Sequence, residues 1–303
     1  MSSETRFRSA AITRRGLLGG LAGGLLLPRM ASAGVAPTGP VVALEYGIAS
    51  TMLKLGAVPA AVASLDGWQK WVVEPAMPPE VVDLGSAWEV NLEILAGMRP
   101  ELILTTPFLA FLRPKLEPIA PIVSIDVYGA GGGDALERAI DETVKLGDIL
   151  GRQQQATAFL GEAQALFEDC ATRIRRLRPG PLAVVSFTDQ RHARIHGRPG
   201  LYHSVMQRIG VENAWTVETN MWGFQTIGIE ELGRLQADRT RLVVMEPLPP
   251  DVPAALERST LWQSLPFVRQ KQVSTMPAVL LFGMVEEAQR FARLLTEHLE
   301  RLA

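Results

Sequence analysis

Short apolar runs alternate with longer amphipathic stretches along most of the chain, and the alternation occurs twice. Runs of this kind, rich in Val, Ile and Leu, occupy 40–47, 100–107 and 120–127 in the first series, and 180–188, 240–247 and 271–279 in the second. The stretch 48–64 between two of them reads as a helix, a glycine-bounded turn and another strand. Strands alternating with helices predict parallel sheets with helices on both faces. The fold class is therefore α/β, with two units.

The region between the two series has the most regular pattern. Its apolar residues are spaced alternately by four and three, which places them on one stripe of a helix: Ala156, Leu160, Ala163, Phe167, Cys170, Ile174 and Leu177. The 26 residues from Arg152 to Leu177 would form a helix roughly 39 Å long. We expect 152–178 to bridge an N-terminal lobe, 34–151, and a C-terminal lobe, 179–303, each a mostly parallel sheet flanked by helices. The alternative is a surface helix of one domain.

The N-terminus is expected to be a cleaved export signal covering residues 1–33. Arg14 and Arg15 precede an apolar run over 16–27, and an A-x-A site follows at 31–33. About twelve apolar residues are fewer than the roughly 20 needed to span a bilayer. The paired arginines favour the twin-arginine route, and an ordinary signal peptide is the alternative. Both predict export, most simply to a periplasm.

Charge and cysteine content narrow the function further. Residues 1–33 contain five arginines and one glutamate, so the 25 basic and 31 acidic residues that follow carry a net charge of −6. This balance argues against nucleic-acid binding, which needs a basic surface. Cys170 is the only cysteine and falls inside the helical stripe, so we expect a buried core residue. We expect a monomer.

No catalytic or metal-binding constellation is visible. The four histidines form no H-E-x-x-H pattern, and the chain contains no C-x-x-C or G-x-S-x-G motif. Three of the histidines lie within 192–203, but no carboxylate falls between them to complete a metal site. We therefore expect that the protein has no metal of its own and no enzyme activity.

Several stretches carry a resemblance to a known family. They are VVALEYG (41–47), KWVVEPAMPPEVVDLG (70–85), VNLEIL (90–95), VENAWTVETNMWG (211–223) and LWQSLPFVRQKQVSTMPAV (261–279). The chain resembles the periplasmic ferric-hydroxamate siderophore-binding proteins of the helical-backbone class. The resemblance implies two α/β lobes bridged by one long helix, with a ferric siderophore held in a shallow cleft between them. Iron would enter only as part of the chelate, and an ABC-type permease would be the membrane partner.

The resemblance also implies ligand contacts on aromatic residues. Trp71 and Trp222 match family positions that line the cleft, and Asn220 lies beside the second. Trp215 matches a shared element in which either an anchoring role or ligand contact is possible. Tyr46 ends the first predicted strand, at the edge where parallel strands present ligands.

Several family positions are changed in this chain. An arginine that grips hydroxamate oxygens is replaced by Ala87, a partnering tyrosine by Leu109, a tryptophan by Leu280 and a second tyrosine by Phe282. Trp88 stands beside the lost arginine, and Phe108 and Phe111 flank Leu109. Loss of a charge-assisted hydrogen bond removes about 1.5–3 kcal/mol of binding.

Basic residues elsewhere could compensate for the lost arginine. Arg194, His196 and Arg198 follow the first predicted strand of the C-terminal lobe, although a solvated turn is the alternative. We expect a ligand unlike a simple trihydroxamate, such as a mixed citrate-hydroxamate or a more apolar chelate. A receptor of the same fold for cobalamin or haem remains an alternative, and an exported α/β enzyme is a more remote one.

A second functional surface is implied for the permease. In the family, one glutamate on each lobe docks onto arginines of the membrane partner. Glu93 and Glu230 match those positions. Both stand at predicted helix starts, where carboxylates are also common because they complement the helix dipole.

Overall fold

The computed structural model describes residues 36–303, with the exception of Ala130 and 236–239. The expected export signal, 1–33, lies outside the described residues. The described part belongs to one compact unit. Within it, no helix is both long enough and apolar enough to cross a membrane.

The first sheet is parallel throughout, as the alternating pattern predicts. Its strand order is β3-β2-β1-β4-β5, and every neighbouring pair is parallel. The strands are β1 (Val41–Ala43), β2 (Ala61–Val62), β3 (Val82–Asp83), β4 (Leu102–Thr105) and β5 (Ile122–Ser124). The connecting helices are α1 (Tyr46–Lys54), η1 (Leu65–Gly67), α2 (Trp68–Trp71), α3 (Leu92–Gly97), η2 (Pro107–Leu112), α4 (Arg113–Leu116) and α5 (Ala135–Ile149).

The second sheet is mixed: one of its strands is reversed and the other four point the same way, so the expected mostly parallel arrangement is present with one exception. Its order is β10-β9-β6-β7-β8. The strands are β6 (Leu182–Phe187), β7 (His192–His196), β8 (Phe224–Gly228), β9 (Arg241–Met245) and β10 (Val273–Met276). β7 runs antiparallel to both its neighbours. It follows β6 through a tight turn, in which Asp189 Oδ1 accepts the backbone N–H groups of Arg191 and His192, so only a reversed strand fits.

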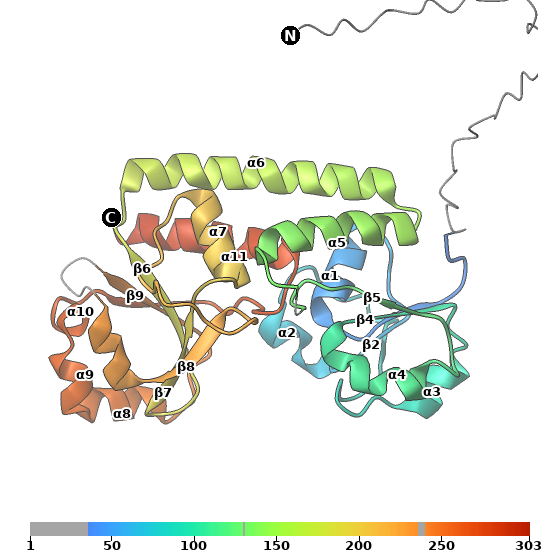
Figure 1. Ribbon diagram of the computed structural model, residues 1–303, viewed down its shortest axis with the longest axis horizontal. Helices are drawn as coiled ribbons and strands as arrows, with labels where there is room; N and C mark the ends of the chain where they lie inside the picture. Colours follow the sequence, from blue (N-terminus) through green and yellow to red (C-terminus); the bar gives the residue numbers. More distant parts are fainter. Residues whose placement is uncertain (1–35, 130, 236–239) are drawn as a thin grey trace, which may run out of the picture. The chain divides into compact units, whose positions relative to one another are not determined.

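The helices of the second lobe are α7 (Leu201–Ile209), η3 (Ile229–Arg234), α8 (Val252–Arg258), α9 (Thr260–Ser264), α10 (Pro266–Arg269) and α11 (Val285–Arg301). α8, α9 and α10 cover the outer side of the second sheet (Figure 1). A hydrophobic core that includes Trp262 and Phe267 lies in this part of the second lobe. A separate core on the first sheet includes Leu84, Leu95 and Ile103.

The predicted long helix is present as α6 (Gln153–Leu177) and runs past both lobes (Figure 1). It buries the expected stripe, on which Cys170 is 1% exposed. α6 packs against α5 of the first lobe, α7 of the second and α11. An ion pair between Arg173 and Glu300 of α11 fixes its C-terminal end.

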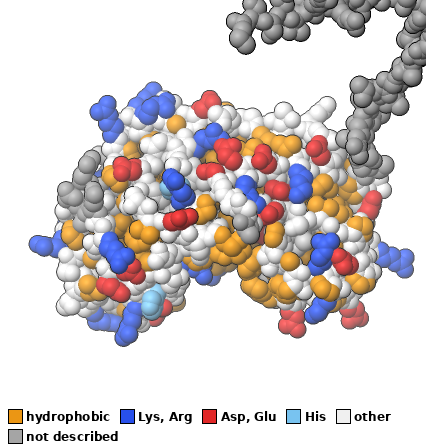
Figure 2. Space-filling model, in the orientation of Figure 1, with side chains coloured by type: hydrophobic (Ala, Val, Ile, Leu, Met, Phe, Trp, Pro, Cys, Tyr) orange, Lys and Arg blue, Asp and Glu red, His pale blue; other side chains and the backbone are white. Residues whose placement is uncertain are grey.

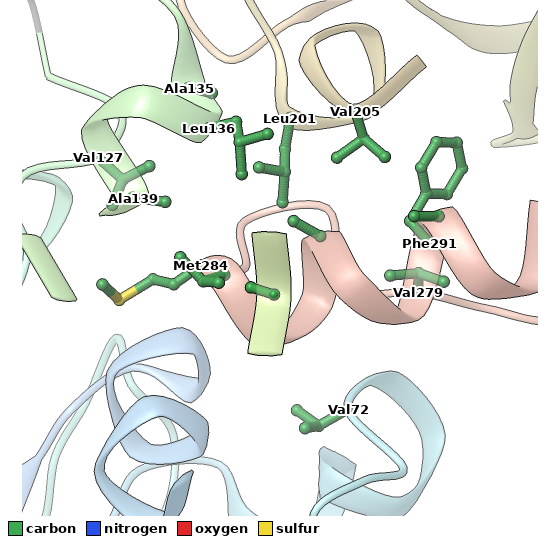
Figure 3. Close-up of a cluster of buried hydrophobic side chains, with 14 of the residues drawn as sticks. Val72, Val127, Ala135, Leu136, Ala139, Leu201, Val205, Val279, Met284 and Phe291 are labelled. Carbon is green, nitrogen blue, oxygen red and sulfur yellow. The ribbon is translucent and has the colours of Figure 1, made fainter. Parts of the chain in front are cut away.

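The C-terminal helix α11 also joins the lobes, which the sequence pattern did not indicate. It packs on α1 and α5 as well as on α6 and α7. Glu74 of the first lobe pairs with both Arg290 and Arg293 of α11. One hydrophobic cluster includes buried residues of both sheets and of the helices that join the lobes. Figure 3 shows its side chains approaching one another from α5, α7 and α11.

Candidate functional site

An apolar pocket lies beyond the carboxyl ends of the first sheet, the usual ligand position in open α/β sheets. Its cavity volume is about 180 Å³. The segments after all five strands supply most of its wall, and the second lobe adds three side chains. The lining residues are Leu44, Glu45, Tyr46, Ile48, Ala63, Ser64, Ala87, Trp88, Thr106, Pro107, Phe108, Leu109, Ile125, Val127, Tyr128, Trp222, Phe282 and Met284. In Figure 2 the lower edge of the molecule is notched between the lobes, and hydrophobic side chains gather beside the notch.

The first-lobe rim of the pocket is aromatic and unusually exposed. Trp88 is 61% exposed and Phe108 is 48% exposed. Their rings meet edge to face with centroids 4.9 Å apart, and the ring of Phe111 stacks on that of Trp88 with centroids 5.7 Å apart. Large apolar side chains rarely remain this exposed as a group unless they contact a ligand or a partner.

Trp222 and Phe282 extend the aromatic surface into the second lobe. The ring of Trp222 meets Phe108 edge to face at 5.2 Å and Phe282 at 5.5 Å. Phe282 in turn meets Tyr128 of the first lobe at 5.7 Å. A continuous series of aromatic rings therefore joins the two lobes across the pocket.

The loop around Trp222 is held in place by Asn220. The Oδ1 atom of Asn220 accepts the backbone N–H groups of Trp222, at 3.0 Å, and Phe224, at 3.3 Å. Gly223 has φ +79°, and a Cβ there would come within 1.9 Å of the Gly200 Cα, so the turn requires glycine. Asn220 thus positions the tryptophan and does not itself line the pocket.

Tyr46 lines the pocket. Its hydroxyl donates to the Ser64 carbonyl, and the ring meets Trp68 edge to face at 5.6 Å. Burial, with the nearby Asp66 carboxylate, raises the pKa of Tyr46 to about 12. Tyr46 therefore stays protonated and links the segments after β1 and β2.

Two neighbouring carboxyl groups lie where the first lobe meets the start of α11. Glu45 caps α1, with Oε2 accepting from Gly47 N at 2.7 Å. Glu287 accepts from Ser50 Oγ at 2.6 Å and Met284 N at 2.8 Å. Burial raises the pKa of Glu45 to about 8, helped by the charge of Glu287. Burial also raises the pKa of Glu287 to about 7.

The raised pKa of Glu287 predicts a stability that falls with rising pH. The folded protein holds this proton more tightly than the unfolded chain, so its contribution is complete below about pH 4.5 and is lost as pH rises through about 7. Between pH 5 and 8.5 the ionisation of Glu287 should lower the free energy of unfolding of the original protein by about 2–3 kcal/mol. The Glu287→Gln variant should lack this part of the decrease. Urea unfolding at both pH values measures it. Equal pH slopes for the two proteins would contradict the assignment.

The structure places several predicted ligand residues outside the pocket. Trp215 is only 4% exposed and belongs to the second-lobe core, so it anchors the loop. Trp71 is 38% exposed, with the Lys70 ammonium 4.6 Å from its ring centroid. Leu280 packs against the shared core.

The basic group suggested to replace the lost arginine is also absent from the pocket wall. Arg194 lies on β7 with its guanidinium 4.8 Å from the ring centroid of Phe224. Arg198 is exposed, and its carbonyl accepts from Thr219. His196 is buried beside Ser186, and burial lowers its pKa to about 3. It is therefore a neutral core residue, not a contact for an anionic ligand.

Five other predicted or replaced positions meet in the pocket with Tyr46 and Trp222: Ala87, Trp88, Phe108, Leu109 and Phe282. The sequence analysis missed Glu45, Ser64, Thr106 and Tyr128. Each follows a strand end, the one signal that could have indicated them. Tyr128 also ties the lobes together, since its hydroxyl donates to the Gly283 and Leu281 carbonyls.

The two glutamates expected to meet a permease are both exposed. Glu93 lies in the first turn of α3 and Glu230 in the first turn of η3. Neither forms an ion pair with another of the described residues. Across the same residues, no group of three or more His, Cys, Asp or Glu side chains could hold a metal ion.

Comparison with known proteins agrees with this geometry. The sequence profile of the family described as periplasmic binding protein matches residues 41–280. The iron(3+)-hydroxamate-binding protein FhuD of Escherichia coli K12 is 31% identical over 287 residues, covering 94% of this chain and 95% of FhuD.

Solved structures share the fold. The FhuD siderophore-binding protein of Vibrio cholerae, bound to Fe³⁺-Desferal, superposes with a TM-score of 0.81 at 23% identity, covering 88% of this chain and all of that one. The triscatecholate siderophore-binding protein FeuA of Bacillus subtilis gives a TM-score of 0.69 at 17% identity, over 89% of this chain and 95% of its own. The chain belongs to the periplasmic binding protein family.

Proposed function

We propose that the protein is a periplasmic receptor that captures a ferric siderophore of hydroxamate or mixed hydroxamate type and delivers it to an ABC-type permease. The observation that carries the proposal is the aromatic pocket at the first sheet's carboxyl edge, in a chain related over nearly its whole length to a ferric-hydroxamate-binding protein. The proposed location is the periplasm, and the proposed working form is a monomer.

The pocket wall suits a ligand whose iron is already coordinated. Its rings offer large rigid surfaces that pack against a chelate without ligating the metal. Trp88 and Phe108 of the first lobe and Trp222 of the second line the same pocket, so a bulky guest in it would touch both lobes. The iron would therefore be carried as part of the ligand.

The shared core argues that capture involves limited movement of the lobes. α6 and α11 both pack on first-lobe and second-lobe helices, and the ion pairs from Glu74 to Arg290 and Arg293 cross the same junction. A large hinge rotation would have to separate these buried contacts. The ligand would enter a pocket that is largely formed in advance.

A titration panel tests the proposal. The mature protein is titrated with a ferric trihydroxamate, a ferric citrate-hydroxamate, a ferric catecholate, cobalamin and haem, and tryptophan fluorescence is followed. We expect saturable quenching by a hydroxamate-containing ferric chelate, because Trp88 and Trp222 line the pocket. No quenching by any ferric chelate, with saturable binding of cobalamin or haem, would overturn it.

Delivery to the permease is proposed to depend on Glu93 and Glu230. Both carboxylates are exposed, one on each lobe, and could each meet a basic group of a membrane partner. We expect the double change Glu93→Arg and Glu230→Arg to abolish siderophore uptake in iron-starved cells while affinity for the ferric chelate stays within twofold of the original.

Two other exposed glutamates provide the matched control. Glu80 and Glu257 are also exposed, one on each lobe, and each lies more than ten residues from the docking position on its lobe. Reversing both of these charges alters the net charge equally and should leave uptake intact. Uptake that survives the Glu93 and Glu230 reversal would show that docking uses a different surface.

A further inference from the structure

The pocket contains an acidic group and no basic one. Glu45 is the one charged side chain among the residues that line it, and no Lys, Arg or His of the described chain does so. Glu45 is partly exposed, and its position is fixed because it caps α1. A ligand in the pocket therefore meets a carboxyl group.

One oxygen of this carboxyl group is available for further bonding. Both backbone donors, Gly47 N at 2.7 Å and Ile48 N at 3.3 Å, bind Oε2. Oε1 has no hydrogen-bond partner among the described residues. The two N–H groups thus compensate only part of the charge that Glu45 carries when ionised.

The surroundings of Glu45 supply no counter-charge. Glu287 faces it from α11, Tyr128 from the segment after β5, and Tyr46 from its own helix. All three are acidic or neutral. Lys54 is engaged with Glu286 instead, at 3.2 Å. An ionised carboxylate in an apolar pocket without a cation is costly, and a ligand cation relieves that cost.

Building on the proposed siderophore-binding function, we propose that Glu45 makes the pocket selective for ferric chelates that carry a protonated amine. The ammonium group would donate to the Glu45 carboxylate while the aromatic rings pack on the chelate. An anionic chelate, such as one with a free citrate carboxylate, would meet like charge instead. This assigns a ligand class opposite to the one a pocket arginine would select.

The same assignment predicts the pH dependence of binding. Burial raises the pKa of Glu45 to about 8, so at pH 6 the free protein holds this carboxyl protonated. An ammonium ligand favours the ionised form, so its binding releases a proton. Affinity for the amine chelate therefore rises with pH from 6 to 8.5, whereas a neutral analogue shows a smaller change.

A matched pair of ligands tests the proposal. One is a linear ferric trihydroxamate ending in a primary amine, and the other is the same chelate with that amine acetylated. Calorimetric titration at pH 8.5 should give the amine form about tenfold tighter binding in the original protein, as expected for one charge-assisted hydrogen bond. At pH 6 the ratio should fall toward one. Buffers of different ionisation enthalpy report the released proton.

The variant Glu45→Gln should bring the two affinities within about twofold of each other at both pH values, because its amide can still cap α1 but carries no charge. Glu287→Gln is the control, since it removes the neighbouring carboxyl and should keep the preference for the amine. Equal binding of both chelates by the original protein would overturn the selectivity proposal alone. Failure of both chelates to bind would overturn the proposed function instead.

Discussion

Replacing Trp222 with alanine is expected to weaken binding of a ferric hydroxamate chelate by about 2–3 kcal/mol, or roughly 30- to 150-fold in Kd. Trp222 is the residue through which the second lobe reaches Phe108 on the opposite rim. Its removal takes away a large, rigid contact surface and the ring contacts with Phe108 and Phe282. Calorimetric or fluorescence titration of the purified variant measures the change.

Met221→Ala is the matched control for this variant. Met221 belongs to the same loop and is 42% exposed, but it does not line the pocket. We expect its Kd to stay within twofold of the original. A Trp222→Ala protein that binds as tightly as Met221→Ala would show that the ring series does not hold the ligand.

Replacing Phe291 with alanine is expected to lower the free energy of unfolding by about 3–5 kcal/mol. Phe291 is fully buried on α11 and stacks on Tyr202 with ring centroids 4.4 Å apart. It belongs to the hydrophobic cluster that includes buried residues of both sheets. The loss should therefore weaken the whole described unit, and not one lobe alone.

Urea unfolding followed by circular dichroism and by tryptophan fluorescence measures this effect. We expect both probes to report one transition at the same midpoint, shifted downward in Phe291→Ala. Leu302→Ala, at the exposed end of the same helix, should shift the midpoint little. Two separate transitions would contradict the shared core and would indicate lobes that unfold independently.

The regular parts of the fold could be predicted because they repeat a simple pattern. The α6 stripe recurs over 25 residues, long enough for its helical period to be unambiguous. The buried strands β1, β4, β6 and β9 are largely apolar runs. Such runs are typical of parallel strands covered on both faces.

The second sheet's antiparallel edge could not be predicted as readily. β7 is only five residues long and reads HARIH, with exposed polar residues alternating with buried ones. Its strand character arises from pairing with β6 and β8. β3, with two residues, was missed for the same reason. Tertiary pairing decides short polar segments of this kind.

The candidate site was predicted in part. Trp88, Phe108 and Leu109 were indicated because they match or adjoin changed family positions, and the structure brings them together in one pocket. Tyr128 was missed because its role depends on the loop before α11, which lies more than 150 residues further along the chain. Trp71 and Trp215 were expected at the site but lie outside the pocket, because matching a family position does not fix where a side chain packs.

The position of the iron tests the central claim most directly. Crystals of the protein grown with a ferric hydroxamate chelate can be examined by anomalous scattering at the iron edge. The account predicts one iron in the pocket lined by Trp88, Phe108 and Trp222, coordinated by the chelate and by no protein atom. Iron ligated by protein side chains, or bound only outside this pocket, would contradict it.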